Sequence, residues 1–388
     1  MGNASLTRAL GIAIAAASLV MPGSVALADG QDIPPEVVAG SGAEAGVPLA
    51  ASARPTTPGG ADPDKLIRCL TIEGERFCTE LGFVSFDKGS AGWNEYLASA
   101  LAATPTAGSG DMPLGIALDQ VAALSPSQLA TRQREQIAAA RSAVGRLILS
   151  NSLANNSVLP DGFFAQHPDL NIAEGSARAT ALRAEAAGVP LAASDEAGMV
   201  TAALATPPNA KNIMITYFKQ ERDYWCGPAT MQTIANYNGV VATQATWATR
   251  TGTTTNGTST QNIVTAINTY TTLDTNGGGA YVVLSTPSTN TSTWFMSLHR
   301  SNIGLYNQPI VEHVQLLKAY FPYLTRDHHG HFQAGRGYNT SDGLIRIAEV
   351  YNEADWPGGG AQSAGFRTIP LSSMWAATLA NVNRNIGW

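Results

Sequence analysis

The chain has 388 residues, 23 Lys and Arg against 29 Asp and Glu, and three cysteines. This length is ample for a hydrophobic core and suggests two domains, or one domain with processed segments. Charged residues make up only 13% and the net charge is −6, which argues against nucleic-acid binding. Three cysteines without a CxxC or CxxH pair argue against a disulfide scaffold and against a structural zinc site. Their odd number leaves at least one thiol unpaired.

The N-terminus has the order of a secretory signal peptide. Arg8 precedes an apolar run over residues 9–20, Pro22 breaks it, and Ala26 and Ala28 are the small residues that a signal peptidase reads. The run is shorter than the roughly twenty residues needed to span a bilayer; a buried helix or a membrane anchor is the alternative. We expect cleavage after Ala28 and export, without stable membrane insertion, to a compartment in which disulfides persist.

A flexible leader and then a small hairpin are predicted next. Residues 29–64 are rich in Ala, Gly, Pro, Ser and Thr and poor in large apolar side chains. Structure is expected to begin at Leu66. Cys69 and Cys78 flank a segment that alternates on either side of a Glu-Gly pair, which predicts a hairpin tied by a Cys69–Cys78 disulfide. A redox pair is the alternative, although the spacing is not that of a dithiol active site.

Two helices are predicted in the N-terminal half, and neither carries a chemical cluster. The first spans about residues 125–152, with Ser at its start, Pro in its first turn and apolar residues at three- and four-residue steps. The second spans about residues 173–187. Between them His167 stands alone and is interpreted as a packing or surface residue. The small-residue-rich segment 193–210 is interpreted as a linker.

The third cysteine lies at the start of a predicted helix. A short apolar strand is expected over residues 213–218, and the helix begins at Cys226, with Pro228 in its first turn and Gly239 as its stop. The helix dipole favours an anion at this end, so a thiol there becomes a better nucleophile. A lone cysteine is otherwise a small buried hydrophobe. The side-chain amide of Gln220, upstream, could join the Cys226 backbone N–H in holding an oxyanion.

This combination of residues resembles a known nucleophile motif. Gln220 followed by Tyr224-Trp225-Cys226-Gly227-Pro228-Ala229 is similar to the motif of the C39-like cysteine peptidases, a papain-like group. The similarity continues in Asn238-Gly239, Thr243-Gln244, Trp247-Ala248, Thr251-Gly252-Thr253, Gly257-Thr258 and Ile263 to Ile267-Asn268. It covers roughly residues 210–360 and implies an α+β fold, in which an N-terminal helical part packs on an antiparallel sheet.

A papain-like cysteine needs a histidine base that follows it in the chain. Five histidines follow Cys226, namely His299, His313, His328, His329 and His331. The first two lie in the helix-like stretches 292–300 and 309–319 and are interpreted as packing or surface residues. The cluster over residues 328–331 lacks a carboxylate or thiol motif that would complete a metal site. It is interpreted as a loop with one functional member.

His331 is the predicted base. It opens a strand that leads to Gly-Tyr, a polar turn and a second strand over residues 344–351, similar to the His block of the family. The first strand is less apolar than is usual in the family, and the second does not end in Asp-Pro or Asn-Pro. Asn352 is the best match for the residue that orients the histidine, Asp355 is the second choice and Glu353 the third.

Together with the predicted signal peptide, the resemblance implies a secreted cysteine peptidase that acts on a peptide or protein substrate, with no metal or organic cofactor. His331 takes the proton of Cys226, the thiolate attacks the amide carbonyl, Gln220 helps to hold the oxyanion, and Asn352 fixes the imidazole ring. An amidase or acyl transferase acting on a non-protein amide, such as a cell-wall crosslink, is one alternative. A non-catalytic binding protein on a peptidase scaffold is the other.

The predicted organisation has four parts. A signal peptide (1–28) and the leader (29–64) precede a mainly helical N-terminal region (65–205), and a C39-like peptidase domain with a C-terminal extension follows (206–388). The N-terminal region is interpreted as an inhibitory pro-segment or an accessory recognition module. A last helix is expected near residues 372–381. The oligomeric state is not predicted.

Overall fold

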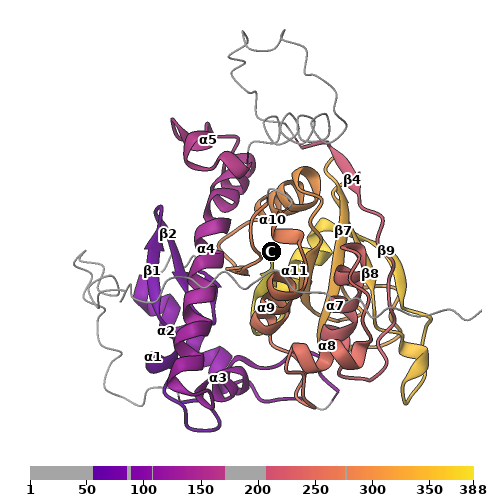
Figure 1. Ribbon diagram of the computed structural model, residues 1–388. Helices are drawn as coiled ribbons and strands as arrows, with labels where there is room; N and C mark the ends of the chain where they lie inside the picture. The colour runs from indigo at the N-terminus through magenta and orange to yellow at the C-terminus, as the bar shows by residue number, and fades with distance from the viewer. Residues whose placement is uncertain (1–55, 85–88, 107, 171–206, 276–277) are drawn as a thin grey trace, which may run out of the picture. The chain divides into compact units, whose positions relative to one another are not determined.

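The computed structural model describes residues 56–84, 89–106, 108–170, 207–275 and 278–388. All of them fall within one of the two units of the chain, residues 41–388. The predicted signal peptide, most of the leader, the second N-terminal helix and most of the linker lie outside the described residues. Within them, helices combine with a mostly antiparallel sheet, which confirms the expected mixed class (Figure 1).

The strands of the described residues form one sheet in the order β1-β2-β3-β5-β10-β6-β7-β8-β9, with β4 paired to β7. All neighbours run antiparallel except β3 and β5, which are parallel. The bounds are β1 Cys69–Ile72, β2 Glu75–Cys78, β3 Gly82–Phe83, β4 Ala210–Asn212, β5 Val283–Ser285, β6 Ile310–Gln315, β7 Gly330–Asn339, β8 Leu344–Glu349, β9 Gly365–Pro370 and β10 Asn385–Gly387.

The helices are α1 Pro63–Leu66, α2 Gly89–Ala102, α3 Leu114–Ala122, α4 Pro126–Asn155, α5 Phe163–Gln166, α7 Cys226–Tyr237, α8 Gln244–Arg250, α9 Thr260–Tyr270, α10 Ser292–His299 and α11 Leu371–Ala380. Short turns of 3-10 helix span Pro168–Leu170, Leu273–Thr275 and Glu353–Asp355, and a π-helical turn spans Arg300–Leu305. The helices predicted near residues 125–152, after Cys226 and near residues 372–381 are all present.

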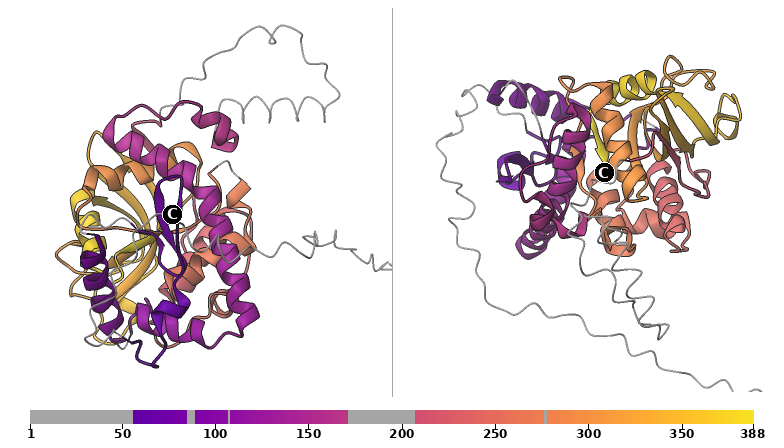
Figure 2. Two further views of the ribbon diagram at one scale, coloured as in Figure 1. Left: turned by 90° about the vertical axis from the view of Figure 1, so that its left-hand side faces the viewer. Right: turned by 90° about the horizontal axis from the view of Figure 1, so that it is seen from above.

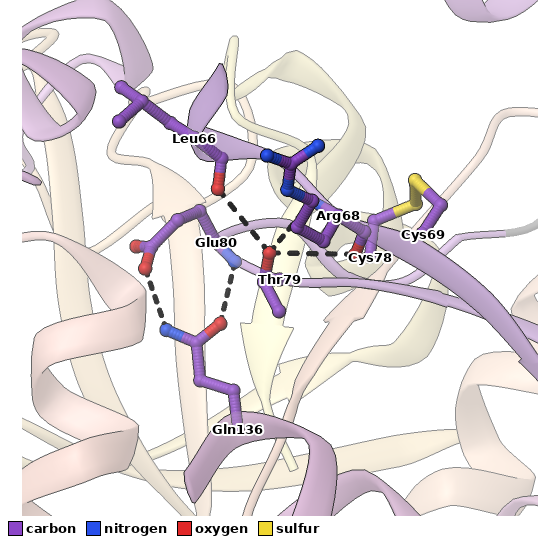
Figure 3. The surroundings of a disulfide bond; sticks show 7 residues. All are labelled: Leu66, Arg68, Cys69, Cys78, Thr79, Glu80 and Gln136. Carbon is purple, nitrogen blue, oxygen red and sulfur yellow. Dashed lines mark hydrogen bonds between the residues drawn. A yellow bond between two sulfur atoms is a disulfide. The ribbon is translucent and has the colours of Figure 1, made fainter. Parts of the chain in front are cut away.

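The predicted disulfide hairpin is confirmed. β1 and β2 pair with Cys69 opposite Cys78, and the two sulfurs are bonded. Glu73 and Gly74 form the turn with φ of 50° and 87°, the left-handed pair that matches the twist of a tight hairpin. Just beyond the disulfide, the hydroxyl of Thr79 accepts a hydrogen bond from the Arg68 backbone N–H, 2.9 Å away (Figure 3). The hairpin is therefore closed by main-chain, side-chain and covalent links.

The long helix α4 begins where the sequence predicts. Gln128 N–H donates to Ser125 Oγ, and Ser125 N–H donates to Gln128 Oε1, which is a capping box. Farther along, α4 contacts α10 (Figure 1). Its buried residues Ala140, Val144 and Leu147 belong to the same hydrophobic core as the helix that starts at Cys226.

The N-terminal region joins the sheet of the rest of the chain. Phe83 of β3 pairs with Leu284 of β5, so the disulfide hairpin extends the main sheet. The guanidinium of Arg132 on α4 binds the Glu80 carboxylate and donates to Asn262 on α9. Two views of the ribbon show these N-terminal elements beside the helices and strands that follow residue 207 (Figure 2).

Two predicted elements are wrong in type or position. The stretch 309–319 was expected to be helical, but Ile310–Gln315 is strand β6, paired with β10 and β7. Its β-branched residues and its burial between two strands favour the sheet. The strand expected over residues 213–218 lies earlier, at Ala210–Asn212. The side chains of Ile213 and Ile215 are buried in the core beyond the end of β4, and the Ile213 backbone N–H still donates to Arg336 O of β7 at 2.8 Å.

Candidate active site

The thiol of Cys226 lies at the N-terminus of α7, as predicted. The N-cap residue of α7, Trp225, makes no side-chain hydrogen bond to the helix, so the N–H groups at the helix start are free to stabilise an anion. Gly239, with φ of 83°, follows the helix end. The backbone N–H of Phe332 donates to Cys226 Sγ over 3.3 Å. With 1% of its surface exposed, the thiol sits in a site closed to bulk water.

His331 lies between the thiol and a carboxylate. Its Nε2 is 2.7 Å from Glu349 Oε1, and its ring is also hydrogen-bonded to Cys226. The first residues of β7 carry it next to the N-terminus of α7, and it is 3% exposed. Burial opposes its charge, but the Glu349 carboxylate and the Cys226 sulfur together raise the pKa of His331 to about 10. The geometry thus favours a protonated imidazole next to the sulfur.

Glu349 is a fully buried carboxylate with each oxygen satisfied. Oε1 accepts from His331 and from the Tyr351 backbone N–H at 2.8 Å, and Oε2 accepts from the Tyr323 hydroxyl at 2.8 Å. Burial raises its pKa, but His331 and these hydrogen bonds outweigh burial and lower it. The strand register explains the encounter: Ala334 pairs with Ala348, so the next residue of β8 stands diagonally from His331 on the same face.

The residues expected to orient His331 lie elsewhere. The Asn352 amide donates to Asp355 and Gln362, at 2.8 and 3.0 Å. Asp355 binds Lys219 at 2.7 Å, and the Glu353 carboxylate binds His328 at 2.7 Å. The geometry therefore puts Glu349, rather than any of these three, against the His331 ring. Glu349 is the last residue of β8, whereas the other three follow the end of the strand.

One sequence signal pointed to Glu349. It is the single carboxylate inside the predicted strand over residues 344–351, between apolar neighbours. A charged side chain within a buried strand requires a partner.

Gln220 is buried close to this centre and is engaged locally. Its Nε2 donates to the carbonyls of Arg222 and Asp223, both at 2.9 Å, and its backbone N–H donates to Val350 O at 2.9 Å. Its Oε1 has no hydrogen-bond partner among the described residues. The loop that leads into α7 is thus fixed by this amide, and an oxyanion would compete with these two carbonyls for its protons.

Three of the other histidines after Cys226, namely His299, His313 and His328, have carboxylate partners of their own. Buried His299 binds Glu312 at 2.7 Å, and His313 binds Asp111 at 3.0 Å. His328 and His329 line a cavity of ≈ 190 Å³ beside His331, together with Tyr351 and others. A larger cavity, of ≈ 410 Å³ between α4 and α9, lacks His and Cys in its lining. The smaller cavity is distinguished by the histidines that line it and not by its volume.

A glycine from the N-terminal region covers the thiol. Gly110 is buried, and a Cβ atom placed on it would overlap Cys226 Sγ and lie 3.1 Å from Cys226 Cβ. Gly108 and Gly110 both line the cavity at His331. No local pattern in the sequence indicated this contact, because it joins residues more than a hundred positions apart.

One stretch of the chain matches a known protein family. Residues 212–361 match the Peptidase_C39 like family. The matched segment contains Cys226, His331 and Glu349, and it confirms the resemblance to C39-like peptidases that the nucleophile motif predicted. A comparison with curated proteins found no match. Among the described residues, no helix is long and apolar enough to cross a membrane.

Proposed function

We propose that this protein is a secreted cysteine peptidase with Cys226 as nucleophile, His331 as base and Glu349 as the residue that orients His331. The observation that carries the proposal is the placement of one buried imidazole between the Cys226 sulfur and the Glu349 carboxylate. The C39-like match over residues 212–361 supports a peptide substrate. The Cys69–Cys78 disulfide is compatible with export.

The reaction follows from the charges in the site. His331 and Cys226 stand as an imidazolium–thiolate pair, and the thiolate attacks the carbonyl carbon of a peptide bond. The oxyanion is held by the N–H groups at the start of α7, and by Gln220 if it exchanges one of its carbonyl partners. His331 gives its proton to the leaving amine. Water, deprotonated by His331, then hydrolyses the thioester and restores the pair.

Glu349 has a role that Asn352 does not fill in this geometry. Its carboxylate accepts from Nε2 and therefore directs the other ring nitrogen, Nδ1, toward the sulfur. Its negative charge also stabilises the imidazolium through the catalytic cycle. This contact favours an enzyme over a non-catalytic scaffold, because a binding protein has no need for a satisfied carboxylate–imidazole–thiol series.

The test is a substitution of the nucleophile in a chain whose thiol is uncovered. Because Gly110 covers Cys226, a panel of fluorogenic peptides is digested with the Gly110→Ala chain and with the same chain carrying Cys226→Ala. We expect turnover from the first and a loss of about 10⁴-fold or more from the second, at unchanged folding. Hydrolysis that survives Cys226→Ala would falsify the proposal. A thioester trapped on Cys226 that is resolved by an added amine rather than by water would favour acyl transfer.

A further inference from the structure

The segment Gly108–Met112, here called the cleft segment, lies across the thiol. Its central residue, Gly110, leaves no room for a side chain between its own backbone and Cys226 Sγ. Residues 109–112 are all buried. A substrate amide cannot reach the sulfur while this segment is in place, because two groups cannot occupy the same volume.

The backbone of the cleft segment is bound as an extended peptide is bound in a groove. Gly110 N–H donates to Gly330 O, next to His331, at 3.3 Å. On the other side, Thr258 N–H donates to Gly110 O at 3.0 Å, and Met112 N–H donates to Thr258 O at 2.9 Å. These last two bonds form a parallel bridge between Asp111 and Thr258. Main-chain bonds to both walls of a groove are the means by which proteins hold extended peptides.

The side chain of Asp111 fills a pocket built for a carboxylate. Oδ2 accepts from His313 Nε2 at 3.0 Å and from Asn381 Nδ2 at 2.8 Å, and Ser109 donates to Oδ1. The wall opposite is Gly330, where a Cβ atom would overlap the carboxylate. Burial raises the pKa of Asp111, but the hydrogen bonds and the nearby imidazole lower it to about 2. The pocket therefore holds a charged acid at neutral pH.

We propose that the groove between Thr258 and Gly330 is a peptide-binding site with two specific positions, one for glycine against the thiol and one for aspartate between His313 and Asn381. In the folded chain the cleft segment occupies this site and masks Cys226. The inference rests on the proposed function in treating the thiol as the reactive group. The N-terminal region supplies the occupant of the groove, with the sequence Gly-Ser-Gly-Asp-Met. The ligands that the groove binds are therefore extended peptides that contain Gly-Asp.

The occupant is held as an inhibitor rather than as a substrate. The carbonyl oxygen of Gly110 is bonded to Thr258 N–H. Attack on that carbonyl would require its oxygen to leave Thr258 and turn to the N–H groups at the start of α7. The segment thus blocks the thiol while its own peptide bond is kept out of register with the oxyanion donors.

The test is the rate at which iodoacetamide alkylates Cys226 in the folded chain at neutral pH. Alanine at position 110 would overlap the sulfur, so Gly110→Ala should expel the segment and raise the rate by about tenfold or more. Gly115→Ala is the matched control: it crowds Pro58 in the same N-terminal region but has no contact with Cys226. It should leave the rate unchanged. Equal, slow alkylation of folded wild-type and Gly110→Ala chains overturns the inference.

A peptide added in trans provides a second measurement. A synthetic peptide with the sequence of residues 108–114 should protect Cys226 of the Gly110→Ala chain from alkylation, and the same peptide with Asn in place of Asp should protect it less. Equal protection by both peptides, or by neither, overturns the aspartate pocket. If Gly110→Ala fails to fold, Asp111→Ala replaces it, since it removes the anchor without crowding the thiol.

The two proposals fail in different ways. Fast alkylation of Gly110→Ala without hydrolysis of any peptide keeps the inference and overturns the peptidase function. Slow alkylation together with rapid, Cys226-dependent hydrolysis by the wild-type chain keeps the function and overturns the occupied groove.

Discussion

Among single residues, His331 holds a positive charge although only 3% of its surface is exposed. A buried charge is costly unless a partner of opposite sign lies within hydrogen-bond distance. Glu349 meets this need at 2.7 Å, and Tyr323 and the Tyr351 N–H complete the bonds of its carboxylate. The contacts that stabilise the buried imidazolium also hold it against Cys226, so stability and chemistry both depend on the pair of His331 and Glu349.

This pair predicts a pH-dependent contribution to stability. The folded pKa of His331 is about 10 against an ordinary value of 6.5, so the folded chain keeps a proton that the unfolded chain releases. The stabilisation is therefore complete below about pH 6.5 and is lost as the pH rises toward about 10. Glu349, whose folded pKa is lowered, contributes above its ordinary value of 4.5 and loses its contribution as the pH falls below it.

The measurement is urea unfolding of the wild-type chain and of Glu349→Gln at about pH 6, 8 and 10. We expect the wild-type advantage in unfolding free energy to be largest at the lowest of these pH values and to shrink at each step. Tyr323→Phe, which removes a neutral partner of Glu349, is the control and should show a smaller change with pH. An advantage that is constant over this range contradicts the charged pair.

Between elements, the parallel contact of β3 with β5 decides whether the disulfide hairpin belongs to the main sheet. Gly82 begins β3 with φ of 83°, and its backbone passes so close to Val283 that a Cβ atom would overlap the Val283 carbonyl oxygen. Glycine is needed here for two reasons, the left-handed conformation and the close approach. Gly74, in the hairpin turn, shares only the first reason, because no atom of the described residues lies within 4 Å of where its Cβ would be.

The two glycines form a matched pair of substitutions. We expect Gly74→Ala to cost about 1 kcal/mol of unfolding free energy, the usual penalty of a left-handed alanine, and Gly82→Ala to cost roughly 2–3 kcal/mol more, because the β3–β5 junction must open. Urea unfolding of both variants gives the difference. Equal losses would mean that the close approach to Val283 contributes nothing.

Across the whole molecule, the N-terminal region and the matched C39-like segment share one sheet and one core. Arg146 illustrates this at a single point. It is fully buried on α4, its Nη1 donates to Gln308 at 2.5 Å, its Nη2 donates to Ala280 O at 3.1 Å, and its guanidinium stacks at 4.1 Å on the ring of Trp388. Burial lowers its pKa to about 10. One side chain thus joins α4 to the C-terminal residue of the chain.

Arg146→Ala should therefore destabilise the entire fold. The substitution leaves a cavity beside Trp388 and leaves Gln308 Oε1 without the hydrogen bond that Arg146 donates. Together these effects predict a loss of roughly 3 kcal/mol of unfolding free energy. Arg141→Ala, on the exposed side of the same helix, is the control and should lie within about 0.5 kcal/mol of wild type. The check is the unfolding midpoint of both variants in urea. Similar midpoints for the two variants, or two separate transitions in either, would contradict a shared core that depends on Arg146.

Local patterns in the sequence determined the disulfide hairpin, the start of α4, the helix that begins at Cys226 and the histidine that opens β7, because each depends on neighbours a few residues away. The tertiary structure decided the rest. Glu349 meets His331 through the register of β7 and β8, and Gly110 and Asp111 reach the cleft through main-chain bonds to Thr258 and Gly330. Strand register and long-range contacts are set by packing of the whole chain, which no local spacing encodes.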